Sequence, residues 1–392
     1  MKKRHCLILL IPLLFASCAK TPSSSSESQP SANDAIVLNE VSGIVDFHSP
    51  VQKDYLDGGI PEEIDHSIAD GKHENSKPVP LNLSWESTQK EGSFEVLLSE
   101  DPSFEKAKEL QTESENVEVS NLKLATTYYW KVRQGGMESA VSSFSTIGGG
   151  PRNLDVDGVT NVRDIGGWEV GGGKRIRQGL LYRGARLNNS YPKGWTKDGG
   201  DLGYSFEKEI TEEGERAFQE DLGIKTEIDL RLSQRNGYPG LPPEEELFSA
   251  VDGVNYIPIP TGGSANINAC KEQIKQVFDL FAIEENYPIY FHCNIGTDRT
   301  GMIAYLLNAF LGVNEIDLFY DYMFSNFGLI AVPNAYDSDP TYKDLTDLTK
   351  ASGASGVVNS FSGTTLSEKA KNCLLSCEIE ESTLEKVRSI LL

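Results

Sequence analysis

Cys293 and Arg299 lie in one short stretch of this 392-residue chain, and together they could bind and attack a phosphate group. An apolar run from Tyr287 leads into Cys293, and a periodic apolar segment follows Arg299, so the pair should lie between a strand end and a helix start. Such a turn directs several backbone N–H groups at one point, where the helix dipole adds positive potential. The same field favours a thiolate, which would make Cys293 a nucleophile near neutral pH. Arg299 could grip two phosphate oxygens with its planar guanidinium group.

The string His292-Cys293-x5-Arg299-Thr300 resembles the signature of the cysteine-dependent protein tyrosine phosphatase superfamily. A lone Cys–Arg pair at this spacing would more often include an inert core cysteine. Here the preceding strand, a glycine in the turn, the Thr-Gly pair and the apolar helix 302–307 accompany it. The resemblance implies that Cys293 and Arg299 are catalytic. It also implies that the other loop residues bind substrate, namely His292, Asn294, Ile295, Gly296, Thr297, Thr300 and Gly301.

Segments before the loop resemble one bacterial branch of this superfamily, which carries HCxxGKDRTG and acts on phosphotyrosine, phosphoserine/threonine and phosphoinositides. They comprise residues 161–167, 179–183, 222–226 and 228–231. Two capping-box helix starts, at Thr365 and Ser382, continue the order that the branch would have. The resemblance covers residues 150–392. It implies a hydrolase that forms a cysteinyl-phosphate, takes a phosphorylated protein, peptide or phosphoinositide as substrate, and needs no cofactor or metal.

The chain departs from the branch at three positions. Thr297 replaces a loop lysine, which removes a cation from the mouth of the site. Arg235 stands where the branch usually has Glu, and Thr261 stands where some members carry an Asp proposed as general acid.

The oxygen that leaves the phosphate needs a proton, which a positioned acid supplies with a rate gain of about 10²–10⁴. Asp298 is the first candidate, because it lies in the loop next to Arg299. An ion-pairing or loop-shaping role for Asp298 is equally plausible. Asp164 and Asp229 are weaker candidates, since each could be a buried partner of Arg163 or Arg231.

Composition indicates an acidic protein with more than one domain. The chain is longer than one hydrophobic core usually organises, and its net charge of −22 makes nucleic acid an unfavourable partner. An acidic body also repels phosphorylated substrates at long range, so the local field of the loop must overcome it.

The N-terminus resembles a bacterial lipoprotein signal. A basic start and an apolar run from Cys6 to Phe15 precede Ala16-Ser17-Cys18. The resemblance implies that residues 1–17 are removed and that Cys18 carries a lipid, which predicts a protein anchored in the bacterial cell envelope. The alternative is an ordinary secretory peptide with Cys18 incidental. Residues 18–34 are rich in serine and predict a flexible tether.

Residues 35–147 alternate apolar and polar side chains over short runs, which predicts half-buried antiparallel strands. The predicted strands include 81–85, 94–98, 117–119 and 129–132. The stretch 122–130 resembles the tyrosine corner of fibronectin type III domains, with Trp85 as a core aromatic, so we expect a β-sandwich. A polar stretch, 54–76, predicts a long loop or insertion.

Gly148-Gly149-Gly150-Pro151 predicts the domain boundary, and alternating strands and helices follow it. Strands are expected at 226–230, 254–259 and 287–293, and helices near Thr211, over 271–281 and after Arg299. This order predicts an α/β phosphatase domain with a mostly parallel sheet covered on both faces and the ligand at the strand C-termini. Residues 188–207 are either a lid or a passive surface loop. Residues 320–322 and 325–326 are expected to be core and capping residues.

Removal of the signal would leave five of the six cysteines, and their spacing does not indicate a disulfide framework. Cys373 and Cys377 are expected in the core of a helix. Cys270 could protect Cys293 by reversible pairing, although no pattern places the two together. The main alternative to an active phosphatase is a phosphate-recognising adhesion or scaffold lipoprotein with little or no turnover. A sulfurtransferase or an arsenate reductase would also use a cysteine anion loop, but the flanking segments resemble neither.

Overall fold

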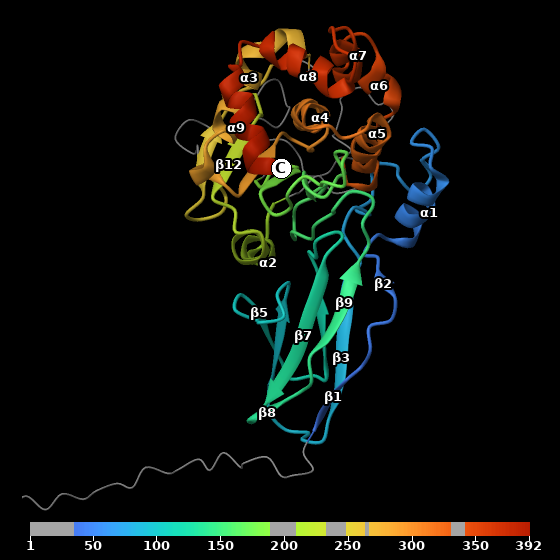
Figure 1. Cartoon of the computed structure of the whole chain (residues 1–392), viewed down its shortest axis with the longest axis vertical. Coiled ribbons are helices and arrows are strands. Elements are labelled where there is room, and N and C mark those ends of the chain that lie inside the picture. The colour runs from blue at the N-terminus through green and yellow to red at the C-terminus, as the bar shows by residue number, and fades with distance from the viewer. Residues whose placement is uncertain (1–34, 189–208, 233–247, 263–265, 331–341) are drawn as a thin grey trace, which may run out of the picture.

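A computed structural model of the chain describes residues 35–188, 209–232, 248–262, 266–330 and 342–392 (Figure 1). Two sheets of the N-terminal half extend away from a body in which helices surround a third sheet (Figure 1). No helix in the described ranges is long and apolar enough to span a membrane. The predicted signal, the tether and Cys18 lie outside these ranges, as do Arg235 and nearly all of the 188–207 insertion.

The N-terminal half holds a three-stranded antiparallel sheet facing a six-stranded sheet. The first comprises β1 (Ile36–Leu38), β3 (Leu81–Ser87) and β6 (Asn116–Val119). The second comprises β2 (Ile44–Val45), β9 (Ser142–Thr146), β7 (Thr127–Gln134), β4 (Phe94–Ser99), β5 (Lys108–Thr112) and β8 (Met137–Glu138). Alternate side chains of the strands fill one core that includes Trp85 and Trp130. The predicted strands are therefore confirmed.

One hydrogen bond has the geometry that the tyrosine-corner pattern predicts. The hydroxyl of Tyr128 accepts a hydrogen bond from the backbone N–H of Lys123 at 2.8 Å. The likeness of this half to a fibronectin type III domain itself stays a prediction.

The second half is built on a five-stranded sheet in the order β10-β11-β14-β12-β13. Its strands are β10 (Arg163–Asp164), β11 (Leu181–Gly184), β14 (Ile289–His292), β12 (Thr226–Asp229) and β13 (Asn255–Pro258). β11, β14, β12 and β13 run parallel, and only β10 is antiparallel to its neighbour. The C-terminal ends of the parallel strands therefore meet at one edge, where β14 lies in the centre.

Successive side chains of β14 enter different cores, which shows how both faces are covered. Ile289 and Phe291 pack with α3 (Lys271–Phe281) and α4 (Asp298–Leu311). Tyr290 points to the opposite face and packs with Phe218 and the segment formed by α2 (Glu212–Arg216) and η2 (Ala217–Asp221). The expected α/β sheet covered on both faces is confirmed, because β-strand side chains alternate between faces.

The C-terminal helices enlarge the α3 and α4 layer. They are α5 (Glu315–Met323), η6 (Phe324–Phe327), α6 (Leu345–Thr349), α7 (Ala354–Asn359), α8 (Leu366–Leu375) and α9 (Glu381–Leu391). Two short turns, η4 (Ile267–Ala269) and η5 (Glu284–Asn286), flank α3. Thr365 and Glu368 form the predicted capping box of α8. The second predicted start is wrong, because α9 begins at Glu381, before Ser382, and has no side-chain cap. Cys373 and Cys377 are buried, as expected.

The polar stretch after β2 packs on the second half of the chain. It begins with α1 (Pro50–Gly58), which lies beside α5 in Figure 1. The Tyr55 ring lies 5.1 Å from the ring of Tyr320 and 5.7 Å from that of Phe324, and Ile64 and Ala69 join the same core. The stretch predicted as a long loop or insertion therefore contributes to the core beside the α5 helix.

The predicted boundary at 148–151 is closely packed on both sides. Arg152 donates to the carbonyls of Leu122 and Asn121 at 3.0 and 2.6 Å, and it pairs with Asp164. The Gln178 side chain donates to the Leu124 carbonyl and accepts from its N–H. The domain boundaries themselves stay a prediction, but these contacts fix one half against the other.

Candidate active site

The Cys293 loop joins the end of the central strand β14 to the start of α4. Gly296 in this loop has a φ of +72°, and a Cβ there would lie 2.5 Å from the carbonyl carbon and oxygen of Gly184. Only glycine fits this close approach to the end of β11 without strain. The loop therefore packs against the C-terminal ends of the parallel strands, which is where the ligand of such a sheet was expected to bind.

Three side chains bind the carbonyl groups of the loop from outside. Asn161 donates to the Ile295 carbonyl at 2.9 Å, Arg183 donates to that of Gly296 at 2.7 Å, and Arg186 donates to that of Asn294 at 3.1 Å. In a trans peptide the N–H points away from the carbonyl, so we expect the N–H groups of these peptide planes to point away from the three side chains. The loop therefore has the polarity of an anion site.

A buried ion cluster fixes the residues that hold the loop. Asp321 of α5 accepts hydrogen bonds from Arg163 at 3.1 Å and from Arg183 at 2.5 Å, and Arg163 also donates to the Asn161 side chain. Burial raises the pKa of Asp321, but the two guanidinium groups outweigh it and hold the pKa below its usual value. Asp321, expected as a core residue, thus positions the loop through Arg183. Asn161, Arg163 and Arg183 lie in segments that resemble the family, but no local pattern in the sequence identifies them as supports of the loop.

The environment of Cys293 favours the thiolate. Burial raises the pKa of this thiol, but the charge of Arg299 and the nearby hydroxyl and backbone N–H of Thr300 outweigh that effect. The net pKa lies below the ordinary value for cysteine. Arg299 is held in turn by the carbonyl of Leu230, to which it donates at 3.0 Å. The structure therefore places a thiol whose thiolate form is favoured beside a guanidinium group, and this arrangement could bind and attack a phosphate.

The side chain of His292 makes its contacts inside the protein, and its expected role in substrate binding stays a prediction. Its side chain is fully buried, with one ring nitrogen 2.8 Å from a Glu227 oxygen and the other 3.0 Å from the Cys293 carbonyl. Burial lowers the pKa of His292, but the charges of Asp229 and Glu227 outweigh it and raise the net pKa. His292 supports the loop from beneath, and Glu227 is a partner that sequence analysis missed.

The remaining loop residues differ in what they can contact. Thr297 is fully buried and its hydroxyl faces the Ile295 carbonyl at 3.4 Å, so this side chain stabilises the turn. Thr300 contacts Cys293. Gly301 begins the packed part of α4 and lines a cavity beside the loop. Asn294 is the one residue of the set, apart from the catalytic candidates, that is partly exposed.

The acid candidates separate by burial. Asp164 and Asp229 are fully buried and pair with Arg152 and Arg231, so their alternative role as structural partners is supported. The partner of Asp164 is Arg152 rather than the adjacent Arg163. Asp298 is 42% exposed at the start of α4, and its carboxylate lies 3.0 Å from the ammonium group of Lys343.

Two further groups lie close to the loop. Among the described residues, one group has potential metal-ligand atoms that lie close together, within 4.8 Å of one another. It comprises Glu227, Asp229 and His292. Arg231 and Tyr256 already bind Asp229, so the cluster is an ion-pair network that includes its own cation. Cys270 lies near enough to Arg299 for its charge to act on the thiol, but the Cys270 thiol donates to the Gly262 carbonyl.

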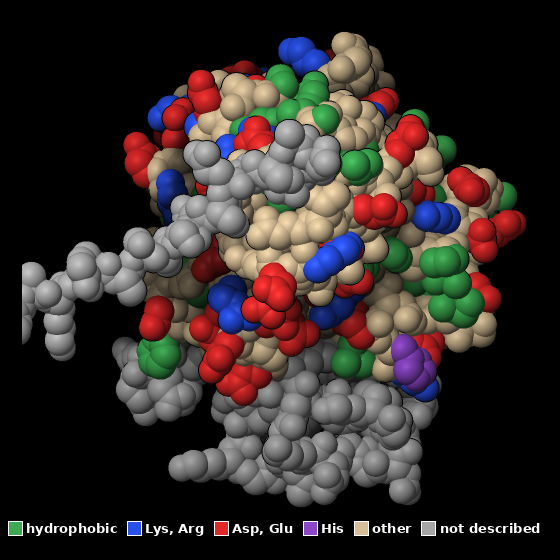
Figure 2. Space-filling model, turned by 90° about the horizontal axis from the view of Figure 1, so that it is seen from below, with side chains coloured by type: hydrophobic (Ala, Val, Ile, Leu, Met, Phe, Trp, Pro, Cys, Tyr) green, Lys and Arg blue, Asp and Glu red, His purple; other side chains and the backbone are tan. Residues whose placement is uncertain are grey.

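The protein as a whole is acidic. Figure 2 shows Asp and Glu side chains spread over one face of the molecule, seen from below, with Lys and Arg among them. With a net charge of −22, the protein attracts a phosphate only through the local field of the loop.

Comparison with known proteins gives a consistent family match. Residues 154–198 and 207–355 match the model of the tyrosine phosphatase family. A putative tyrosine-protein phosphatase from Cupriavidus necator is 26% identical over 203 residues, which cover 45% of this chain and 64% of the relative. A tyrosine-protein phosphatase from Nostoc commune is 29% identical over 139 residues, covering 30% and 45%. The chain thus spans less than two thirds of the length of these relatives.

Among solved structures, the core catalytic domain of the PP-IP phosphatase SIW14 from S. cerevisiae, in complex with citrate, is similar at 19% identity. The match covers 41% of this chain and 82% of that one, with a TM-score of 0.25.

Proposed function

Because residues 154–198 and 207–355 match the model of the tyrosine phosphatase family, we propose that this protein is a cysteine-dependent phosphomonoester phosphatase. The observation that carries the proposal is the environment of Cys293, where Arg299 and Thr300 lower the pKa of a buried thiol. A structural cysteine in an apolar core would have its pKa raised instead, as Cys373 and Cys377 have.

The reaction proceeds in two displacements. The Cys293 thiolate attacks phosphorus, the bond to the ester oxygen breaks, and that oxygen takes a proton as it leaves. Water then attacks the cysteinyl-phosphate, which returns the thiolate and releases inorganic phosphate. Arg299 and the loop N–H groups stabilise the equatorial oxygens in both steps.

We propose Asp298 as the group that gives the first proton. It adjoins Arg299 and is partly exposed, whereas Asp164 and Asp229 are enclosed in ion pairs.

The substrate is proposed from the family and not from a bound ligand. A phosphotyrosine or phosphoserine/threonine peptide, or a phosphoinositide, offers the monoester that the loop would bind. The N-terminal half is proposed as a fibronectin type III-like sandwich that spaces the catalytic half from the membrane, and Cys18 as its lipid attachment in the bacterial envelope.

The test is turnover by the full chain of an aryl phosphate, phosphotyrosine and phosphoserine peptides, and inositol phosphates. We expect release of inorganic phosphate from at least one of them, and loss of this activity in Cys293→Ser with the fold retained. The scaffold alternative is supported by Thr297 and by the absence of an acid at the buried Thr261. It would predict phosphate binding without turnover in the wild type.

A further inference from the structure

A second cation lies beside the phosphate loop, from a distant part of the chain. The loop itself lacks a lysine, since Thr297 occupies that position and is fully buried. Lys343 precedes α6, and its ammonium group lies 3.0 Å from the carboxylate of Asp298, the first residue of α4. Because Asp298 adjoins Arg299, Lys343 reaches the same end of α4 as the catalytic arginine.

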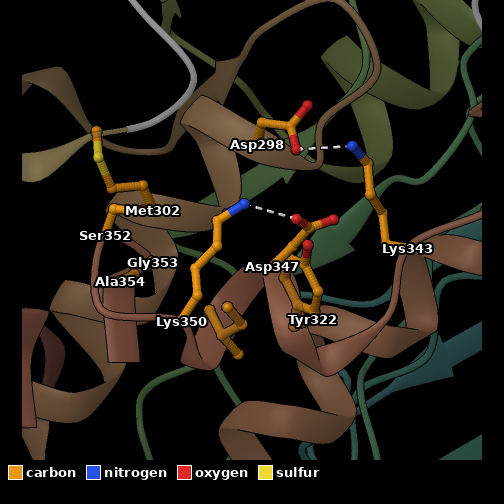
Figure 3. A pocket seen from close by; sticks show the side chains of 11 residues that line it. Asp298, Met302, Tyr322, Lys343, Asp347, Lys350, Ser352, Gly353 and Ala354 are labelled. Atoms are coloured by element: carbon orange, nitrogen blue, oxygen red, sulfur yellow. Dashed lines mark hydrogen bonds and ion pairs between the residues drawn. The ribbon is translucent and has the colours of Figure 1, made fainter. Parts of the chain in front are cut away.

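Figure 3 shows Lys343 and Asp298 pointing toward one another across a cavity of about 210 Å³ that reaches Gly301 at the start of α4. A second lysine, Lys350, lines the same cavity but pairs with Asp347 on its other side. The Lys343 side chain is 24% exposed and that of Lys350 is 56% exposed. Lys343 is therefore enclosed beside the loop, whereas Lys350 extends toward solvent.

The charge of Lys343 interacts with the reaction centre. Burial lowers the pKa of its ammonium group, but Asp298, Asp347 and Cys293 outweigh this effect and raise the net pKa. Lys343 is thus a cation at neutral pH and lies within electrostatic range of the nucleophile. A bound phosphate dianion carries more negative charge than the thiolate and extends from it into the mouth of the site, so it attracts Lys343 more strongly.

Residues remote in sequence fix the position of Lys343. Asn326 of η6 accepts from its backbone N–H at 2.6 Å and donates to its carbonyl at 2.9 Å. The neighbouring Tyr342 ring stacks on His66 at 3.7 Å, and the N–H of Gly71 binds the Asn326 carbonyl at 3.1 Å. The polar stretch from the N-terminal half therefore orders this lysine before substrate arrives, which reduces the entropy lost on binding.

We propose that Lys343 is a substrate-binding residue whose ammonium group contacts the oxygens of the phosphate bound over Cys293. It supplies from another segment the cation that the loop lacks at Thr297. As a point charge it favours a dianionic phosphate monoester over a monoanionic diester. This inference rests on the proposed function, since it takes the loop to be a phosphate site.

The experiment measures binding of inorganic phosphate by calorimetry to the full-length Cys293→Ser protein, where no turnover is involved. Adding Lys343→Met should weaken the Kd about tenfold or more, which corresponds to about 1.4 kcal/mol. Lys350→Met, in the same cavity, should leave it within about twofold. Lys343→Gln serves as a second variant if the methionine variant does not fold. An unchanged Kd in the folded Lys343 variant would overturn the inference.

A double variant separates contact with phosphate from neutralisation of Asp298. If Lys343 acts only by neutralising Asp298, then Asp298→Asn together with Lys343→Met restores the original Kd, and the inference is overturned. If Lys343 contacts phosphate, the double variant remains weaker than Asp298→Asn alone by the same factor. Binding that depends on Lys343 in a protein whose wild type shows no turnover would leave this inference standing while the proposed phosphatase activity fails.

Discussion

Thr300→Val should weaken the activation of Cys293 without changing the shape of the loop. The variant removes a buried hydroxyl that has no hydrogen-bond partner among the described residues and is free to donate to the Cys293 thiolate. It keeps the backbone N–H of residue 300, which also favours the thiolate. A hydrogen bond to a charged group contributes about 1.5–3 kcal/mol, which corresponds to about 10- to 150-fold in the equilibrium between thiol and thiolate. Thr300 is fully buried, and valine has nearly its volume, so the packing of α4 should persist.

The assay is the rate of Cys293 alkylation by iodoacetamide as a function of pH, since only the thiolate reacts. Below the inflection of the wild type, the variant should react about 10- to 150-fold more slowly, and its inflection should lie at higher pH. Thr300→Ser keeps the hydroxyl and should behave as the wild type. Thr297→Val is a matched control, because that hydroxyl faces a carbonyl instead of the sulfur. A Thr300→Val profile that superimposes on the wild-type profile would refute the assigned role.

Four further predictions concern the loop and its supports. Arg299→Lys should lower kcat/KM roughly a hundredfold or more in steady-state assays, because lysine cannot bind two phosphate oxygens in one plane. A decrease of less than about threefold would exclude this two-oxygen contact of the guanidinium group. Asp298→Asn should slow the turnover of alkyl phosphates by about 10²–10⁴-fold and that of nitrophenyl phosphate far less, because nitrophenolate leaves without a proton. Equal slowing of both substrates would indicate that Asp298 shapes the loop. The pKa of His292 is raised above 6.5, so the folded state binds its proton more tightly, and the unfolding free energy should fall as pH rises above that value. His292→Asn should flatten this dependence in denaturant titrations at several pH values, and an unchanged slope would argue against it. A protein truncated to residues 150–392 should be less stable and less active than the full chain, because it loses Tyr55 from the core; equal melting temperatures and rates would contradict this.

The nucleophile and the phosphate-binding arginine of the loop could be predicted because the residues that form the loop are adjacent in the sequence. Cys293, Gly296 and Arg299 belong to one turn, and the strand and helix that flank it have clear apolar patterns. For the same reason the helix over 271–281 was predicted at its observed bounds. Local patterns report local structure, and here the tertiary fold did not override them.

The supports of the site come from distant segments, and no local pattern identifies them. Asp321 looked like a helix residue, and its contact with Arg183 exists only because α5 packs beneath the loop. Lys343 likewise meets Asp298 across the fold. The burial of His292 could not be predicted, because its position beside Cys293 does not tell which way its side chain points, and a residue at a strand end can face the core.

The most direct test of the central claim is a search for the covalent intermediate on Cys293. The wild-type protein is mixed with an aryl phosphate, quenched in acid within its first turnovers, and analysed by intact and peptide mass spectrometry. We expect a mass gain of one phosphoryl group on the peptide that contains Cys293, and no such gain in Cys293→Ser. Release of inorganic phosphate at an undiminished rate by Cys293→Ser would contradict this expectation.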